Sequence, residues 1–316
     1  MPKVVNSYVI QSWFLDSVDF ENVPVTLSEL DSRFVMREVD AETLRAASKW
    51  EPLLRGHAQA ERDGWVPLSD LARTRRGIAT GANDFFLITP SKARQKAIRA
   101  SMLLPCVGRA VDVQGKVFSE ADYEALSLSD AKCLLLNLTS TPDINERAYI
   151  VEGEADDLPS RYILANRQPW YSMEQRAPAA IWAAVFGRGD LGFVYNKVGA
   201  RSLTNFHCVY PREHGDVFAR ALTVALNSEV VRQGAKGHAR GYGGGLMKFE
   251  PNDLKSIQVP DLRRARRDTV DALSGLLDDL DRAERERLSV AALNKAINDA
   301  VRLAGEEART TAISLL

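Results

Sequence analysis

The first part of the chain alternates between strand-like and helical spacing of apolar residues. Loose alternation of β-branched and aromatic residues over 3–15 and 33–39 predicts two short strands. Over 40–55, apolar residues recur at helical spacing between a candidate N-cap, Asp40, and a terminating Gly56. This part is therefore expected to combine two strands with one helix.

The middle and the end of the chain have stronger patterns. Residues 178–210 contain three apolar segments, and the breaks at 187–190 and 199–202 are typical of hairpin turns. Helical spacing returns over 215–233 and again over 263–316. The pattern predicts an α+β fold: a mixed, β-rich domain with flanking helices and a C-terminal helical hairpin.

Between these parts the periodicity is weaker. Residues 85–88 form an apolar, strand-like segment whose two phenylalanines are expected to anchor the core. A basic helix is expected near 91–101, a partly helical acidic segment at 118–130 and a buried strand at 133–138. A second acidic run, 143–160, has little periodicity and predicts a solvated loop or insertion.

Charge is distributed unevenly, although the formal net charge is only −1. Residues 64–110 contain eight Lys/Arg and two Asp/Glu, and residues 161–249 contain twelve and five. The segment between them, 111–160, contains three Lys/Arg and eleven Asp/Glu. Two basic blocks on either side of an acidic one favour a basic face on a binding protein over ordinary variation in surface charge.

Composition excludes several classes of protein. Three widely spaced cysteines without a CxxC pair support neither a zinc ribbon nor a disulfide framework. No run of 18 apolar residues and no signal-peptide pattern occurs, so we expect a cytoplasmic protein without a membrane partner.

Catalytic motifs are also absent. The chain lacks a P-loop motif, and its four histidines lack metal-ligand spacing, so no metal ligand is assigned. His207 alternates with apolar residues and is interpreted as a hydrogen-bonded strand histidine. Asp253 and Lys255 have the carboxylate-x-lysine spacing of some nucleases, but 251–253 is better explained as a turn and helix N-cap.

Two basic, glycine-rich segments carry the most information. Residues 73–86 (RTRRGIATGANDFF) lead from an arginine cluster through two glycines to buried aromatics, and residues 234–248 (GAKGHARGYGGGLMK) alternate basic and small residues. Glycine permits close approach of the backbone, and arginine suits phosphate or guanine. Nucleic-acid recognition is the hypothesis that these segments favour.

Four segments in a fixed order extend this hypothesis. They are 76–86, 104–109 (LPCVGR), 161–171 (RYILANRQPWY) and 242–260 (YGGGLMKFEPNDLKSIQVP). Together they resemble the C-terminal target-recognition region of TaqI-like N6-adenine DNA methyltransferases of type II restriction–modification systems. The resemblance covers about residues 64–262, and the ordered combination makes it specific.

The resemblance implies a recognition region without its catalytic half. Methyltransferases of this family carry an S-adenosylmethionine loop and an [ND]-PP-[YF] motif, and neither Asn-Pro-Pro nor Asp-Pro-Pro occurs here. Residues 1–63 are then a linker or remnant of a methyltransferase domain, 64–262 a DNA target-recognition domain, and 263–316 a helical tail for packing or partner docking. The implied partners are double-stranded DNA and a methyltransferase subunit or domain that binds S-adenosylmethionine.

We expect three groups of residues near DNA. Arginines at 73–76 would lie along phosphates, the glycine-permitted loop at 80–83 near DNA, and 196–201 in a second row. Asparagine could pair bidentately with adenine, and arginine with guanine. A third group would come from the segment at 236–248, for which a mobile connecting loop is the alternative. The candidate DNA-binding residues are Arg73, Arg75, Arg76, Thr80, Gly81, Asn83, Asn196, Lys197, Arg201, Lys236, His238, Arg240, Tyr242 and Lys248.

Two other functions stay open at the level of sequence. One is a Mg²⁺-dependent nuclease subunit that uses Asp253 and Lys255. The other is an adaptor similar to the specificity subunits of multisubunit restriction systems, with 263–316 as the docking element.

Overall fold

The structure is a computed structural model that describes residues 8–11, 35–38, 45, 62–138, 141–188, 192–235, 240–242 and 246–314. The expected N-terminal strands are present as β1 (Tyr8–Gln11) and β2 (Val35–Glu38), which pair antiparallel. Apart from Arg45, the helix expected over 40–55 lies outside the described residues.

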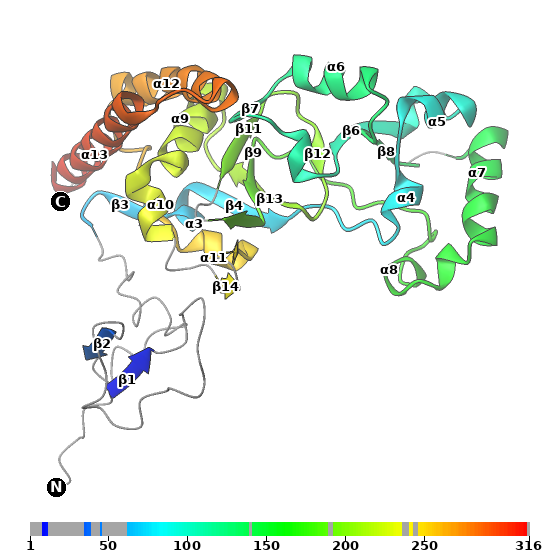
Figure 1. The fold of residues 1–316 in the computed structure, drawn as a ribbon, viewed down its shortest axis with the longest axis horizontal. Helices are drawn as coiled ribbons and strands as arrows, with labels where there is room; N and C mark the ends of the chain where they lie inside the picture. The colour runs from blue at the N-terminus through cyan, green and yellow to red at the C-terminus, as the bar shows by residue number, and fades with distance from the viewer. Residues whose placement is uncertain are drawn as a thin grey trace, which may run out of the picture.

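Two mixed sheets form the centre of the molecule (Figure 1). The five-stranded sheet has the order β4 (Ala72–Arg76), β13 (Phe206–Pro211), β9 (Ile181–Ala184), β11 (Phe193–Asn196), β7 (Val117–Phe118). The four-stranded sheet has the order β12 (Arg201–Ser202), β6 (Leu103–Val107), β8 (Leu134–Leu136), β5 (Leu87–Ile88). In each sheet one pair is parallel, β11 with β7 and β12 with β6, and the other pairs are antiparallel. The expected α+β class is confirmed.

Helices cover these sheets at opposite ends of the molecule (Figure 1). At one end are α9 (Asp216–Asn227), α10 (Glu229–Ala235), α12 (Arg267–Glu286) and α13 (Ala291–Ser314). At the other are α4 (Asn83–Phe86), α5 (Pro90–Gln95), α7 (Ile144–Ala155) and α8 (Tyr162–Ala165). Between them lie α3 (Leu68–Leu71), α6 (Glu120–Leu128) and α11 (Pro251–Lys255). The strand pair β3 (Trp65–Pro67) with β16 (Gln258–Pro260) packs against α13 at the first end. The remaining strands are β10 (Phe186–Arg188), β14 (Arg240–Tyr242) and β15 (Leu246–Lys248).

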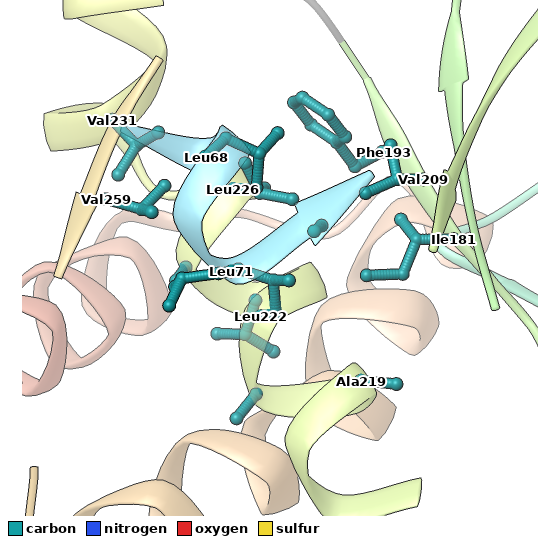
Figure 2. Packing of buried hydrophobic residues seen from close by; sticks show 14 of the residues in the cluster. Leu68, Leu71, Ile181, Phe193, Val209, Ala219, Leu222, Leu226, Val231 and Val259 are labelled. Carbon is teal, nitrogen blue, oxygen red and sulfur yellow. The ribbon is translucent and has the colours of Figure 1, made fainter. Parts of the chain in front are cut away.

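The larger core lies between one face of the five-stranded sheet and the C-terminal helices (Figure 2). Strand residues Phe193 and Val209 meet Leu222 and Leu226 of α9, all almost fully inaccessible. Leu273 of α12 belongs to the same cluster, and α12 packs along α9. The helical tail is thus built into the core of the body.

A second core is centred on aromatic residues beneath the four-stranded sheet. The Phe85 ring stacks on that of Tyr149 with centroids 4.5 Å apart, and the Tyr149 hydroxyl donates to the Phe85 carbonyl at 2.8 Å. Phe85 and Phe86 anchor this core, as predicted. The strand expected over 85–88 is wrong in part, because the two phenylalanines are the last two residues of α4 and only Leu87–Ile88 is a strand.

The acidic run at 143–160 is a helix over most of its length, which corrects the expected loop. Asp143 and Glu146 form a capping box at the start of α7, and the helix buries Glu146, Tyr149, Ile150 and Gly153. A carboxylate in the first buried position breaks the apolar stripe that normally reveals a helix. The helix is stable because Arg99 pairs with that carboxylate, with Nε 2.8 Å from Glu146 Oε1.

A polar junction joins α12 of the C-terminal tail to β7, which is the edge strand opposite β4 in the five-stranded sheet. Asp281 Oδ1 on α12 accepts hydrogen bonds from the backbone N–H groups of Lys116 (2.7 Å) and Val117 (2.8 Å). Arg285, one turn later, donates to both carboxylate oxygens of Asp122, at 2.7 and 2.8 Å, and to the Val117 carbonyl. These contacts fix β7 at the edge of the sheet.

Replacing Asp281 with alanine should destabilise the protein. The change leaves two half-buried backbone donors without their acceptor, which costs about 1–3 kcal/mol. Urea unfolding followed by circular dichroism measures this loss. Asp299→Ala on the outer face of α13 is the control and should stay within about 0.5 kcal/mol of wild type; an equal effect of the two substitutions would contradict the role of the junction.

The Arg99–Glu146 pair predicts a specific acid sensitivity. The hydrogen-bonded Arg99 guanidinium lowers the pKa of the fully inaccessible Glu146 carboxyl. The ion pair contributes fully to the free energy of unfolding above the ordinary glutamate pKa, about 4.3. This contribution is lost as the pH falls through the lower pKa that Glu146 has in the folded protein. Glu146→Gln should therefore be less stable at pH 7, with the difference shrinking below about pH 4.3. Thermal melts of both proteins across this range test it, and a difference independent of pH would refute it.

Candidate nucleic-acid interface

Strand β4 presents its arginines at the open edge of the five-stranded sheet. Its neighbour in the sheet is β13 on one side only. Ala72 and Thr74 are buried, whereas Arg73 and Arg75 alternate with them and are exposed. The Thr74 hydroxyl donates to the Pro251 carbonyl at 2.9 Å, which fixes β4 against α11. Both arginines are thus held on the other face of the strand.

A cleft of about 230 Å³ opens beside these two arginines. It is lined by Arg73, Arg75, Gln175, Arg176, Ala177 and Tyr210. Pairing of β4 with β13 places Arg73 opposite Tyr210, whose hydroxyl donates to the Ala177 carbonyl at 3.2 Å. Burial raises the pKa of Tyr210 to about 12, so the phenol is neutral at physiological pH.

The cleft has an excess of positive charge. Arg176 pairs with Glu174 and donates to the Arg76 carbonyl, which fixes its side chain beside the end of β4. In the described part of the chain, no carboxylate forms an ion pair with Arg73, Arg75 or Arg76. Guanidinium groups without a counter-charge, next to a neutral hydroxyl, suit a phosphate diester.

The sequence predicted the arginines of β4 but not the other wall of this cleft. Gln175 and Arg176 belong to the segment before β9, and they reach the cleft only through the folding of the chain. The alternation of Cys208 and Tyr210 in the sequence indicates a strand, but it does not show that this strand, β13, pairs with β4.

The glycine loop after β4 is held rigidly by the protein itself. Arg167 donates to the carbonyls of Ala79 (2.6 Å) and Thr80 (3.1 Å). A Cβ on Gly77 would lie 2.1 Å from the Leu203 carbonyl oxygen. Gly81 has φ +82°, and a Cβ there would come within 3.1 Å of Ile163. The protein's own packing therefore requires glycine at these two positions. The close approach of the backbone that the sequence predicts is explained by contacts within the protein.

Thr80 and Asn83 play different parts in this loop. Thr80 is 1% exposed, accepts from the Ala82 N–H at 3.1 Å and donates its hydroxyl to Asn83 Oδ1. The Thr80 hydroxyl is therefore enclosed by the loop, and the position of Thr80 near DNA stays a prediction. Asn83 is exposed at the start of α4, and its contact with adenine stays a prediction.

The second expected row, 196–201, does not form one surface. Asn196 is 5% exposed and hydrogen-bonds to the backbone of Ala179 and Ala200. Arg201 is half-buried, with its Nε enclosed and one terminal nitrogen 3.4 Å from the Gly199 carbonyl. Lys197 is exposed and lies 3.5 Å from Glu120. Asn196 is a structural residue of the turn, and the second row of DNA contacts at 196–201 stays a prediction.

The third expected group lies on a separate small sheet. Strands β10, β15 and β14 pair antiparallel in that order, and they contain Arg240, Tyr242 and Lys248. Lys236 and His238 lie outside the described residues. The hairpin turn expected at 187–190 is wrong at its first two residues, because they continue β10 and pair with β15.

Asp253, one of the two residues proposed for a nuclease, serves the fold. Asp253 is 5% exposed, and its Oδ2 accepts from the Glu250 N–H at 2.9 Å in the capping box of α11. His207 is 3% exposed with Nε2 2.7 Å from the Phe249 carbonyl, and burial lowers its pKa. The interpretation of His207 as a hydrogen-bonded strand histidine is confirmed. Within the described ranges, no three His, Cys, Asp or Glu side chains are grouped as metal ligands.

Among the described helices, none has both the length and the apolar character needed to cross a membrane.

Comparison with protein families gives one match over most of the chain. Residues 56–301 match the family described as type II methyltransferase M.Eco57I, C-terminal domain.

Two relatives agree with this match, and one solved structure has a distant similarity to the chain. Type II methyltransferase M.AccI from Acinetobacter calcoaceticus is 33% identical over 83% of this chain and 51% of its own length. Type II methyltransferase M.XamI from Xanthomonas campestris pv. amaranthicola is 26% identical over 71% of this chain and 42% of its own. The chain spans about half the length of these relatives. The type IIG restriction endonuclease BpuSI aligns with 87% of this chain and 36% of its own at a TM-score of 0.47 and 11% identity, too distant to support an argument.

Arg167→Ala should loosen the glycine loop. Two loop carbonyls lose a half-buried guanidinium donor, which costs about 1–3 kcal/mol. We expect a lower melting temperature and faster hydrogen exchange over residues 79–83. Arg161→Ala is the exposed control on the same segment and should change neither quantity. Unchanged exchange in Arg167→Ala would show that the loop is held by other contacts.

Proposed function

The chain belongs to the family of type II methyltransferase M.Eco57I C-terminal domains, and from this premise we propose that it recognises a specific duplex-DNA sequence for adenine-N6 methylation. The proposal places the chain in a restriction–modification system as the recognition region. Methyl transfer from S-adenosylmethionine would be performed by a catalytic half outside this chain. The short coverage of the relatives supports that division, because about half of each lies outside the match.

The arginine cleft at the β4 edge is the observation that carries the proposal. Arg73 and Arg75 are exposed and lack a carboxylate partner among the described residues, and Arg176 closes the cleft. Like charges gathered in this way repel one another, so the arrangement gains stability when an anion binds. A DNA backbone supplies phosphates at regular spacing and releases counterions on binding.

The acidic block of the sequence does not oppose this role. Its carboxylates are used in part within the fold, as in the pairs Asp122–Arg285 and Glu146–Arg99. Helices α6 and α7 carry four of the other nine acidic residues of this block, and none of the nine lines the arginine cleft. A chain with a net charge of −1 therefore retains a locally basic surface.

The role of the tail also follows from the core. Leu273, Leu277 and Ile297 are buried together with residues of α9 and the five-stranded sheet. Packing, one of the two roles expected for 263–316, thus has direct support. Docking of a partner stays a prediction. Removing the whole tail is a poor test of it, because the larger core would lose the buried residues Leu273, Leu277 and Ile297.

Arg75→Ala should weaken DNA binding at all sequences by about the same factor. The loss of one phosphate contact lowers the slope of log affinity against log salt concentration by about 1. Fluorescence anisotropy with a cognate and a random duplex at several salt concentrations measures both quantities. Arg302→Ala on α13 removes one exposed arginine elsewhere and should leave the slope unchanged. Equal slopes for Arg75→Ala and wild type would contradict a phosphate contact at this cleft.

A further inference from the structure

Helix α7 has apolar residues on two opposite faces. On its inner face, Tyr149 and Ile150 are buried in the second core. On its outer face, apolar residues recur at intervals of four, three and four, which places them in one line along a helix. This line is called the outer stripe, and it consists of Ile144, Ala148, Val151 and Ala155.

The outer stripe is open to solvent. Ile144 is 82% exposed and Val151 is 59% exposed, and both alanines are exposed as well. A surface helix normally carries polar side chains opposite its buried face, so an uncovered apolar line there is typical of an interaction surface. Helix α7 lies at the end of the molecule away from α12 and α13, where a second molecule can reach it (Figure 1).

Charged residues lie on both sides of the outer stripe. Arg147 and Glu154 are two turns apart on one side, and Glu152, which pairs with Lys96, lies on the other. The two glutamates outnumber the single arginine, so this surface does not suit the phosphates of DNA. A suitable partner instead combines an apolar surface with charges of both signs.

A groove of about 660 Å³ adjoins the stripe on the side of Arg147 and Glu154. Its wall on α7 includes Val151, and its other wall includes Pro169 and Tyr171. The Arg147 Nε donates to the Pro142 carbonyl at 3.0 Å, and Glu154 accepts from the Trp170 indole N–H at 3.3 Å. Both charged side chains are thus held beside the groove, which makes the contact surface wider than one helix.

The outer stripe is complementary to a second copy of itself. In an antiparallel pair of α7 helices, a two-fold axis between residues 149 and 150 places Ile144 opposite Ala155 and Ala148 opposite Val151. The same axis brings Arg147 of each copy beside Glu154 of the other. A parallel pair would place Arg147 against Arg147 and Glu154 against Glu154, and like charges repel. The charges therefore select the antiparallel arrangement.

We propose that the protein forms a symmetric dimer through the outer stripe of α7, with a second copy of this chain as the partner. A two-fold interface requires a surface that is complementary to itself, whereas an unrelated partner imposes no such symmetry. The helix pair is about 17 Å long, so the interface is small and we expect a dissociation constant of roughly 10–100 µM. The arginine cleft takes no part in this contact, and the inference does not depend on the proposed function.

Sedimentation velocity of the full chain without DNA, from about 1 to about 500 µM, tests the dimer. Wild type should change from monomer to dimer across this range. Val151→Glu places a charge in the apolar contact and should raise the dissociation constant by about tenfold or more. Leu128→Glu is the matched control, because Leu128 is an exposed apolar residue of another helix, α6, and it should dimerise like wild type. Circular dichroism melts show whether each variant is folded.

A charge swap tests the pairing of the two copies. Arg147→Glu and Glu154→Arg each place like charges opposite one another, so each should raise the dissociation constant by roughly 3- to 30-fold. The double variant Arg147→Glu/Glu154→Arg restores opposite charges and should recover most of the wild-type affinity. A role of either residue within one molecule would give no such recovery.

Cross-linking tests the antiparallel direction. The three native cysteines are buried, so an introduced surface cysteine is the accessible thiol. A mixture of Ile144→Cys and Ala155→Cys chains should form a disulfide between copies under mild oxidation. Ile144→Cys alone should not, because its two thiols would be about 17 Å apart.

The contrary outcomes are equally specific. A monomer at every concentration would refute the dimer, and a dimer that Val151→Glu leaves intact would use another face and refute the role of α7. Equal weakening by Leu128→Glu would identify non-specific association instead. Rapid cross-linking of Ile144→Cys alone would overturn the antiparallel arrangement. None of these results bears on DNA binding, which the salt titration of Arg75→Ala tests separately.

Discussion

The one-sided pairing of β4 with β13 is the constraint on which the basic surface depends. The register places Thr74 opposite Val209 and Arg73 opposite Tyr210, so the two faces of β4 differ. A shift by one residue would turn Arg73 and Arg75 into the core and expose Thr74. The Thr74–Pro251 hydrogen bond and the buried Ala72 oppose such a shift. The position of the arginine cleft is therefore determined by the same contacts that stabilise the sheet.

A second set of hydrogen bonds makes the surroundings of the cleft rigid. Arg167 ties the glycine loop to the segment after α8, and Asp281 and Arg285 tie the tail to β7. A surface that is ordered before binding pays less conformational entropy when DNA binds. The arginines next to the loop are thus held in position by the fold before any ligand binds.

Much of the fold was predictable from local sequence, and the failures have identifiable causes. The strands of 178–210, the helix after Asp216 and the two C-terminal helices have clear periodicity and were predicted. Helix α7 was missed because a buried carboxylate, Glu146, stands where an apolar residue normally reveals the helix. The last two residues of β10, Gly187 and Arg188, were expected in a turn because the partner strand, β15, is far away along the chain. Long-range pairing of this kind leaves no local signal.

The candidate site was predictable to a smaller extent. Arg73 and Arg75 were recognisable from their charge and spacing, but Arg176 and Tyr210 reach them only through tertiary contacts. Thr80 and Asn196 have residue types suited to DNA, and the fold uses them internally instead. Polar residues serve caps and turns as often as ligands, and only burial and hydrogen-bond partners distinguish the two uses.

Selection of duplexes from a random DNA library by the full chain, at two salt concentrations, is the most direct test of the account. We expect enrichment of one short sequence, with total binding that falls steeply as salt rises. Salt-dependent binding without any enriched sequence would contradict recognition and leave only a basic surface. The absence of binding at low salt would contradict the assignment of the arginine cleft as well.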